Sequence, residues 1–456
     1  MEEIKNEAIK AEEKAPEVFG EQEKKDHQHH HHSDHHHHHG KHRHHHSHKH
    51  KKQKKFSFRK LKKTIIKNKK ILIPVGVFCL AGLVLLAMLG VVELITQNKS
   101  DDQTQTIQGT DGMVIIATPV MAEEQVLVNN ATKVIKEAEA VNVASHELLR
   151  DYLQNNSRLD TGVPVTLNFY LANKPTDYFV DRYTVEVAES DSFQDAWEYT
   201  LAADAQSLNI YNLKTGTRYY YRINVHFKNG IVSSAGSSFQ TAESPRILTI
   251  GGVYNARDIG GWKTADGKTI KQGLLYRGTE LDGAVKAEYK LTDEGRAFMR
   301  DYLGIQMEID LRGPGENPDS INALGDDIEH IYFGTSHYTD VFLEGNQEPI
   351  RKVFSELARK DNYPIYMHCT YGRDRTGTVS CLLEALLGVS KEDIWRDYQL
   401  SALDNKYQDI IAFGSFVLAL ENQPGESLQA KTENYLRSIG VTGEEIAAIR
   451  TIYLGE

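Results

Sequence analysis

The sequence predicts a multidomain chain with a single transmembrane helix, a β-sandwich and an α/β domain. Residues 71–92 form one apolar stretch without a charged side chain, residues 163–242 alternate in short strand-like patterns, and residues 246–456 alternate between strand-like and helix-like patterns. A chain of 456 residues has room for two or three domains, because one domain usually takes roughly 100–200 residues.

Residues 1–70 are predicted to form a disordered, His-rich and basic cytoplasmic tail. They hold 16 of the 21 histidines and 19 Lys/Arg against 10 Asp/Glu, so the tail carries +9 and the rest of a chain of net charge −10 carries −19. Such an acidic body argues against a nucleic-acid partner. Imidazoles in the tract from His27 to His50 could bind divalent metal incidentally, but no ligand spacing defines a site.

The apolar stretch at residues 71–92 is predicted to be the transmembrane helix, since about 20 apolar residues span a bilayer. Its flank, residues 51–70, holds eleven Lys/Arg and no acid. The positive-inside rule therefore places the N-terminus in the cytoplasm and the later domains on the outer side of the cell membrane. A cleaved signal peptide is the alternative, but the stretch begins far from residue 1, has a long basic flank and is longer than the apolar core of a typical signal peptide.

Residues 93–162 are predicted to form a stalk and a segment without a clear pattern, and residues 163–242 a β-sandwich. In the sandwich, alternating apolar and polar residues are bounded by turn-forming residues. The strands predicted in this way are Thr166–Tyr170, Tyr183–Val187 and Tyr219–Val225.

One turn in this region carries a family resemblance. The run Asn212-Leu-Lys-Thr-Gly-Thr-Arg-Tyr219 resembles the turn and following strand of fibronectin type III domains, with Thr215 where that family usually has Pro. The resemblance implies that Tyr219 is a corner tyrosine, with a buried ring and a hydroxyl bonded to the backbone.

Residues 246–456 are predicted to form an α/β sheet domain, because strands and helices alternate along them. The clearest strands are Ile305–Leu311 and Tyr363–His368. A helix is predicted over Thr376–Leu387 and should end at Gly388.

The motif that points to chemistry is His368-Cys-Thr-Tyr-Gly-Arg-Asp-Arg-Thr-Gly377. Cys369 ends a predicted strand, Gly372 permits a tight loop, and Arg375 opens a predicted helix. A loop built in this way can point its N–H groups inward and bind an anion at the positive end of the helix. The same field favours thiolate over thiol at Cys369, which makes the sulfur a nucleophile.

The other residues of the motif have predicted supporting roles. Arg375 would hold two phosphoryl oxygens bidentately, which Lys could not do. The hydroxyl of Thr376 can donate a hydrogen bond to the sulfur, and His368 is expected to buttress the loop. The residues predicted to bind substrate are Thr370, Tyr371, Gly372, Arg373, Thr376 and Gly377.

Cys-x5-Arg-Thr after His resembles the signature of protein-tyrosine and dual-specificity phosphatases, and Cys-x-x-Gly-Arg-Asp-Arg-Thr-Gly is similar to a bacterial branch that also acts on phosphoinositides. The resemblance covers about 210 residues and implies an α/β cysteine-dependent phosphatase domain. Four further segments resemble that branch in the same order, namely Asn255–Gly261, Tyr276–Gly278, Ile309–Arg312 and Asp397–Ser401.

The leaving oxygen of a phosphate ester needs a proton from a carboxylic acid. The resemblance assigns this role to Asp374 inside the signature. Asp310 is the second candidate, although it could instead form a structural pair with Arg312 or Arg257. Asp319, in an Asn-Pro-Asp run, is the third candidate.

Three upstream residues, Asn255, Arg257 and Asp258, are expected to fix the loop by hydrogen bonds, with Arg312 as a further support. No metal or other cofactor is expected, because a cysteinyl-phosphate replaces the metal-activated water of other phosphatases.

The predicted function is that of a membrane-anchored phosphatase with an extracytoplasmic catalytic domain, acting on phosphotyrosine protein by resemblance. A phosphoinositide or inositol phosphate is the alternative substrate. A surface adhesin or phospho-ligand binding protein is the non-enzyme alternative, but a binding protein has no need of a nucleophile. The Arg375-Thr-Gly ending argues against a sulfurtransferase.

Overall fold

The computed structural model describes residues 105–108, 114–118, 124–137, 159–243, 245–313, 315–316, 321–404 and 409–455. All of them lie in the second of two compact units, Met1–Gly90 and Val91–Glu456. The predicted tail and the apolar stretch at residues 71–92 lie outside the described residues. Within the described ranges no helix is long and apolar enough to cross a bilayer, so the membrane span stays a prediction.

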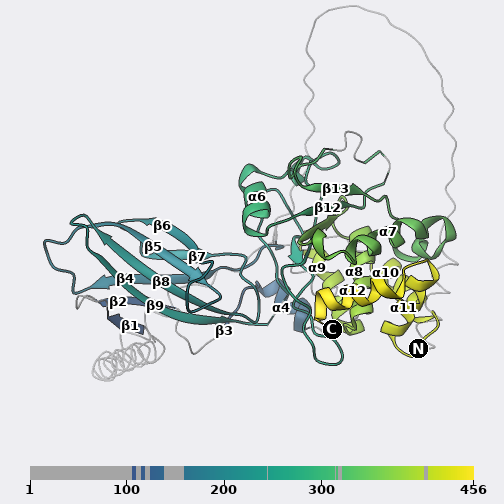
Figure 1. The fold of residues 1–456 in the computed structure, drawn as a ribbon, viewed down its shortest axis with the longest axis horizontal. Coiled ribbons are helices and arrows are strands. Elements are labelled where there is room, and N and C mark those ends of the chain that lie inside the picture. The colour runs from purple at the N-terminus through teal and green to yellow at the C-terminus, as the bar shows by residue number, and fades with distance from the viewer. Residues whose placement is uncertain are drawn as a thin grey trace, which may run out of the picture. The chain divides into compact units, whose positions relative to one another are not determined.

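The N-terminal part of the described chain is a sandwich of two sheets (Figure 1). In β8 buried side chains alternate with more exposed ones along the whole strand, as expected of a strand with one face on a core. The first sheet has the order β1 (Gln105–Gln108), β2 (Val114–Thr118), β4 (Val165–Ala172) and β7 (Ser207–Ile210). The second has the order β3 (Glu124–Gln125), β9 (Val232–Thr241), β8 (Arg218–Phe227), β5 (Val180–Ala188) and β6 (Trp197–Ala202).

The three strands predicted in this region are present as β4, β5 and β8, but the sandwich extends beyond its predicted start at Val163. Strands β1, β2 and β3 come from the segment predicted as a stalk and unassigned region, and β2 pairs antiparallel with β4. The run Val114–Thr118 is rich in β-branched residues, which favour strands. Its Ile115 and Ala117 are buried in the sandwich core. The same segment also forms the short helix α4 (Asn130–Glu137).

Tyr219 has the predicted corner geometry. Its side chain is fully buried, and its hydroxyl accepts a hydrogen bond from the backbone N–H of Lys214 at 2.8 Å. Its ring stacks on Phe239 with 5.6 Å between centroids. The tyrosine therefore fixes the loop before β8 to the core of the sandwich.

The C-terminal part is built on a five-stranded sheet in which β14 is central. Strands β11 and β12 pair with β14 on either side in parallel, and β13 continues the parallel order, whereas β10 is antiparallel to β11. Parallel strands end at one edge, where open α/β sheets bind their ligands. The strands in spatial order are β10 (Arg257–Asp258), β11 (Leu275–Gly278), β14 (Ile365–His368), β12 (Met307–Asp310) and β13 (Glu329–Tyr332).

Helix α8 is the central helix of this domain, and from Thr376 to Leu387 every residue is buried. It ends at Gly388, whose φ of 88° is the left-handed cap expected from the sequence. The helices are α6 (Asp293–Ala297), α7 (Gln347–Leu357), α8 (Asp374–Leu387), α9 (Lys391–Leu400), α10 (Ile410–Glu421), α11 (Leu428–Ser438) and α12 (Gly443–Leu454).

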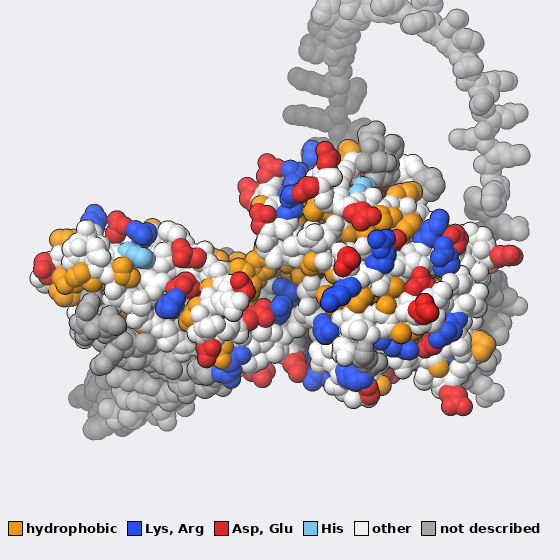
Figure 2. Space-filling model, in the orientation of Figure 1, with side chains coloured by type: hydrophobic (Ala, Val, Ile, Leu, Met, Phe, Trp, Pro, Cys, Tyr) orange, Lys and Arg blue, Asp and Glu red, His pale blue; other side chains and the backbone are white. Residues whose placement is uncertain are grey.

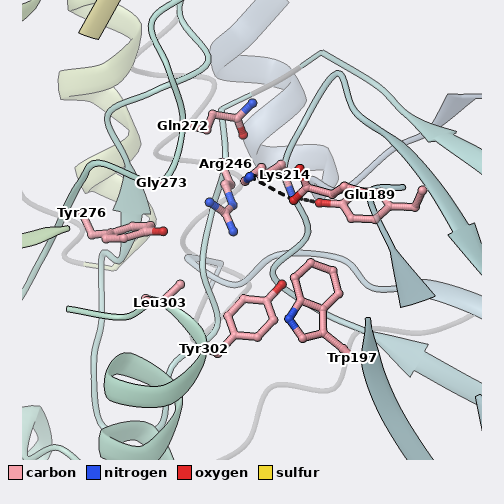
Figure 3. Close-up of a pocket in the computed structure, with 10 residues that line it drawn as sticks. Glu189, Trp197, Lys214, Arg246, Gln272, Gly273, Tyr276, Tyr302 and Leu303 are labelled. Carbon is pink, nitrogen blue, oxygen red and sulfur yellow. Dashed lines mark hydrogen bonds and ion pairs between the residues drawn. The ribbon is translucent and has the colours of Figure 1, made fainter. Parts of the chain in front are cut away.

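Loops of the sandwich contact the C-terminal domain within this unit. The backbone N–H of Thr215 donates to the side-chain oxygen of Gln272 at 2.9 Å, and the Gln272 amide donates back to the Thr215 carbonyl at 2.9 Å. A cavity of about 220 Å³ lies beside this contact. Figure 3 shows it between Arg246, the ring of Tyr302, and the ion pair of Lys214 with Glu189.

Candidate active site

The loop that carries the signature motif joins β14 to α8. Cys369 directly follows β14 and is buried, and α8 begins at Asp374. The positive end of this helix therefore adjoins the loop. Gly372 has a φ of +62°, and a Cβ atom there would lie 2.2 Å from the carbonyl oxygen of Gly278. Only glycine fits at this position.

Arg375 is held by Glu316, a residue that the sequence reasoning missed. Its Nη1 donates to Glu316 Oε2 at 2.6 Å and its Nη2 donates to Oε1 at 2.8 Å. The hydroxyl of Thr370 also donates to Glu316 Oε1 at 2.9 Å. The hydrogen bond from Arg375 is the main cause that lowers the pKa of Glu316 to about 2. The carboxylate is therefore ionised at neutral pH and fixes the guanidinium beside the loop.

Asp374 forms a bidentate pair with its neighbour Arg373. Arg373 Nε donates to Oδ1 and Nη2 donates to Oδ2, each at 2.8 Å. The hydroxyl of Tyr338 also donates to Asp374 and lies 2.6 Å from the hydroxyl of Tyr398. Burial by itself would raise the pKa of Asp374, but the hydrogen bond and charge of Arg373 outweigh it, and the pKa is lowered. Tyr338 has an unusual φ of 51°, which no sequence pattern indicated.

Asp310 lies fully buried at the end of β12 and is paired with Arg312. The same guanidinium also binds Glu280 and Asp282, each at 2.8 Å. Burial by itself would raise the pKa of Asp310. The charge of His368 and the hydrogen bonds from His330 and Arg312 outweigh burial, so the pKa of Asp310 is strongly lowered. This is the geometry of the structural pair that the sequence left as an alternative.

His368, the last residue of β14, supports the start of the loop through two contacts of its ring. Its Nε2 lies 2.9 Å from Glu308 Oε1 and its Nδ1 lies 3.2 Å from the carbonyl oxygen of Cys369. Burial favours the neutral ring, yet Asp310 and Glu308 together raise the pKa of His368 to about 9. A protonated ring donates both hydrogen bonds and so buttresses the loop, as predicted.

Of the three upstream residues, Asn255 contacts the loop directly, and Arg257 holds Asn255 in place. Asn255 Nδ2 donates to the carbonyls of Tyr371 at 3.0 Å and Gly372 at 3.2 Å. Arg257 donates to Asn255 Oδ1 at 2.6 Å and to Asp397 at 2.7 Å.

The prediction for Asp258 is not met by its contacts. Its carboxylate binds Arg246 at 2.9 Å and accepts the backbone N–H groups of Gly260 and Gly273. Successive side chains of a strand point to opposite faces, so Asp258 points away from the side on which Arg257 binds Asn255.

The remaining predicted residues are placed as follows. Thr376 is completely buried in the first turn of α8, and its hydroxyl has no hydrogen-bond partner in the described part of the chain. The expected bond from this hydroxyl to the sulfur is thus not formed. Gly377 packs under the ring of Tyr398. Asp319, the third acid candidate, lies outside the described residues.

The ring of Tyr371 lies among other aromatic and cationic side chains. It meets Tyr289 edge to face at 6.1 Å, and Tyr289 in turn contacts Tyr254 at 5.1 Å. Arg373 and Lys286 lie 5.5 and 5.8 Å from the Tyr371 ring centroid. No group of three or more His, Cys, Asp or Glu side chains suited to a metal ion occurs in the described ranges.

Comparison with known proteins identifies this domain. Residues 248–455 match the model of the family described as the tyrosine phosphatase family. The C-terminal domain is similar to this family. The match begins before Asn255 and ends after α12, so it includes the whole site and its supporting layer. The match supports the enzyme class predicted from the motif, a phosphatase and hydrolase.

Similar proteins with phosphatase names include the following two. A protein of Cupriavidus necator named as a tyrosine-protein phosphatase is 29% identical over 170 residues, which cover 32% of this chain and 59% of that protein. The triple specificity protein phosphatase PtpB of Mycobacterium tuberculosis is 27% identical over 201 residues, 33% of this chain and 68% of PtpB. This chain thus spans only 59% of the length of the first relative.

Among solved structures, the core catalytic domain of the PP-IP phosphatase SIW14 from S. cerevisiae, in complex with citrate, is similar. It is 20% identical, covers 32% of this chain and 84% of its own, and has a TM-score of 0.25.

Proposed function

We propose that this chain is a membrane-anchored phosphatase that hydrolyses phosphate monoesters through a cysteinyl-phosphate intermediate. The observation that carries the proposal is the placement of Cys369 between the end of β14 and the start of α8, with Arg375 fixed beside it by Glu316. A thiolate at a helix N-terminus is an activated nucleophile, and a guanidinium binds two phosphoryl oxygens at once.

The reaction has two displacements. The Cys369 sulfur attacks phosphorus, the S–P bond forms and the bond to the ester oxygen breaks, while Asp374 gives its proton to that oxygen. Water then attacks phosphorus, Asp374 takes a proton from the water, and the S–P bond breaks to release phosphate and the thiolate. The site uses no metal in either step.

The hydrogen bonds that Asp374 receives from Arg373 and Tyr338 affect whether Asp374 can act as the acid. A carboxylate that is held by Arg373 and Tyr338 favours the ionised form, whereas the first step needs the protonated form. The proposal therefore includes a change of partner, in which Arg373 turns from Asp374 to the incoming phosphoryl group. Asp310 is disfavoured as the acid because it is fully buried and bound to Arg312.

Phosphotyrosine protein is the substrate that we favour. The tyrosines beside the loop, Tyr371, Tyr289 and Tyr254, form an aromatic group suited to an aryl ester. Lys286 on the Tyr371 ring is instead suited to a substrate with a second phosphate, so a phosphoinositide is the second candidate. The relative PtpB is named a triple specificity phosphatase, which supports testing both substrate classes on this chain.

The test compares the two substrates on the purified full-length chain in detergent. A phosphotyrosine peptide and a phosphoinositide are supplied side by side, and released phosphate is measured. We expect turnover of the peptide to exceed turnover of the lipid. Turnover of the lipid alone would reverse the substrate assignment, and absence of turnover with both would reject a phosphatase function.

We also propose that the sandwich is a fibronectin type III-like module and that residues 71–92 anchor the chain. The division of the strands into β2-β4-β7 and β9-β8-β5-β6 and the Tyr219 hydroxyl on the Lys214 N–H support the first proposal. The uncharged stretch after a basic flank supports the second.

A further inference from the structure

Arg277, in the Tyr-Arg-Gly segment of β11, connects two parts of the site from beneath the loop. Its side chain is fully buried. Nη2 donates to the carbonyl oxygen of Gly372 at 2.8 Å, and Nη1 donates to Asp397 Oδ2 at 2.6 Å. The Gly372 carbonyl thus accepts from both Arg277 and Asn255, and the Tyr371 carbonyl accepts from Asn255.

These bonds determine which way two peptide groups face. In a planar trans peptide the C=O and the following N–H point in opposite directions. Because the carbonyls of Tyr371 and Gly372 point outward to Asn255 and Arg277, the N–H groups of Gly372 and Arg373 point to the inside of the loop. Inward N–H groups are the donors that bind an oxyanion.

The charged layer beneath the loop, formed by Arg257, Arg277 and Asp397, also favours binding of an oxyanion. Two guanidiniums, those of Arg257 and Arg277, share the carboxylate of Asp397. Glu384 lies nearby, and burial raises its pKa well above the usual value, which disfavours its charged form. Burial lowers the pKa of Arg277 to about 10, which leaves it charged at neutral pH. Arg257, Arg277 and Asp397 together thus place two guanidiniums against one carboxylate beneath the loop.

We propose that Arg277 is a positioning residue that keeps these loop amides turned toward the bound oxyanion of the substrate. The proposal deepens the function proposed above and rests on it for the identity of the anion, a phosphoryl group. Arg277 itself does not touch the substrate, since it is buried behind the loop.

The test compares Arg277→Lys with a matched control, Arg246→Lys. Arg246 is also buried, with 3% of its surface exposed, and is paired with a carboxylate, Asp258, at 2.9 Å. Its side chain donates hydrogen bonds to Asp258 and to the Asn212 carbonyl, away from the loop. Lysine keeps the charge in both variants, but it cannot bind two partners with a planar fork.

Binding of tungstate to the full-length chain is measured by calorimetry at pH 7, together with turnover of an aryl phosphate and thermal unfolding. We expect Arg277→Lys to weaken tungstate binding and to lower kcat/KM by up to about 100-fold, the lower end of the loss of about 10²–10³ seen when an oxyanion donor is removed outright. Arg246→Lys should change each by less than about twofold, the scale of a substitution away from the site, at a comparable loss of thermal stability.

Wild-type tungstate affinity in folded Arg277→Lys would overturn the proposal, and so would equal losses in both variants. If Arg277→Lys does not fold, Asn255→Gly removes the other donor to the same carbonyls, and glycine tolerates the φ of 53° at that position. It should weaken tungstate binding in the same way. Tungstate binding that depends on Arg277 without any ester turnover by the wild type would reject the proposed function but retain this inference.

Discussion

At the scale of single residues, the site combines an activated sulfur with charged side chains that hold one another in place. Glu316 occupies the two terminal nitrogens of Arg375, and Arg373 occupies both oxygens of Asp374. Each pair is partly exposed, so its value lies in fixing geometry rather than in stability. Substitution of these residues should therefore affect catalysis more than folding.

Cys369→Ser should abolish turnover and preserve binding of a phosphate ester. The loop amides and Arg375 remain, whereas the hydroxyl of serine is not ionised at neutral pH. Turnover and equilibrium binding of a phosphotyrosine peptide measure the two effects. Cys381→Ser is the matched control, because Cys381 is the other free thiol among the described residues and is also buried. Turnover by Cys369→Ser near that of the control would contradict the proposed mechanism.

Asp374→Asn should slow esters with poor leaving groups by about 10²–10⁴-fold, the usual contribution of a positioned acid. An ester of an acidic phenol should be slowed much less, because its oxygen departs without a proton. Asp310→Asn should slow all esters alike, since it disturbs Arg312 and not proton transfer. Rates for a series of aryl phosphates measure this, and a loss in Asp310→Asn that depends on the leaving group would transfer the acid role to Asp310.

Glu316→Gln should lower kcat/KM by about tenfold, because a neutral amide holds the Arg375 guanidinium less firmly than a carboxylate does. Steady-state kinetics and phosphate inhibition measure the effect. Glu348→Gln is the control, as Glu348 forms an exposed ion pair with Arg351 at 2.8 Å on α7. Tighter phosphate binding by Glu316→Gln would show instead that the carboxylate competes with the substrate.

At the scale of elements, β14 and α8 form the unit that positions the loop, and the neighbouring strands supply its support. The register pairs His368 with Gly278 of β11 and with Asp310 of β12. The strand ends thus bring the Tyr-Arg-Gly and Ile-Asp-Leu-Arg segments to the two sides of the motif. A buried acidic and basic layer, which includes Glu308, Asp310, Arg312, His330 and His368, lies at this edge.

This layer predicts a loss of stability in mild alkali. The pKa of His368 is raised from 6.5 to about 9 in the folded chain, so the folded state holds its proton more tightly than the unfolded state. The stability that protonated His368 adds to the folded state is fully present below about pH 6.5. It declines above that pH and is lost as the pH rises through about 9. Urea unfolding between pH 6 and 10 measures it, and His368→Gln should flatten that decline. An unchanged pH dependence in His368→Gln would contradict the assignment.

At the scale of the whole molecule, the arrangement proposed from the sequence is a cytoplasmic tail, a membrane anchor, a sandwich and a catalytic domain. Both described domains lie after residue 92, so the anchor would place them on the same side of the membrane. On the face that Figure 2 shows, acidic and basic side chains are interspersed over the C-terminal domain. That face offers no extended basic surface of the kind that binds nucleic acid.

Protease added to intact cells should therefore remove the phosphatase domain and spare the His-rich tail. The basic flank before residues 71–92 predicts a cytoplasmic N-terminus by the positive-inside rule. Antibodies against the two ends of the chain, with and without permeabilisation, measure the result. A protected phosphatase domain in intact cells, digested only after permeabilisation, would reverse the predicted topology.

The chemistry proposed for the loop could be predicted from the sequence alone, because Cys369, Gly372 and Arg375 lie within seven residues between a predicted strand and a predicted helix. Local spacing and chain direction suffice to predict such a site. Only the tertiary structure decided how the loop is held, through Glu316, Arg277 and Tyr338. These side chains lie 59, 95 and 36 residues from the loop residues that they contact. Which distant side chains contact the loop depends on the order of the strands and on burial. No local sequence pattern encodes strand order or burial.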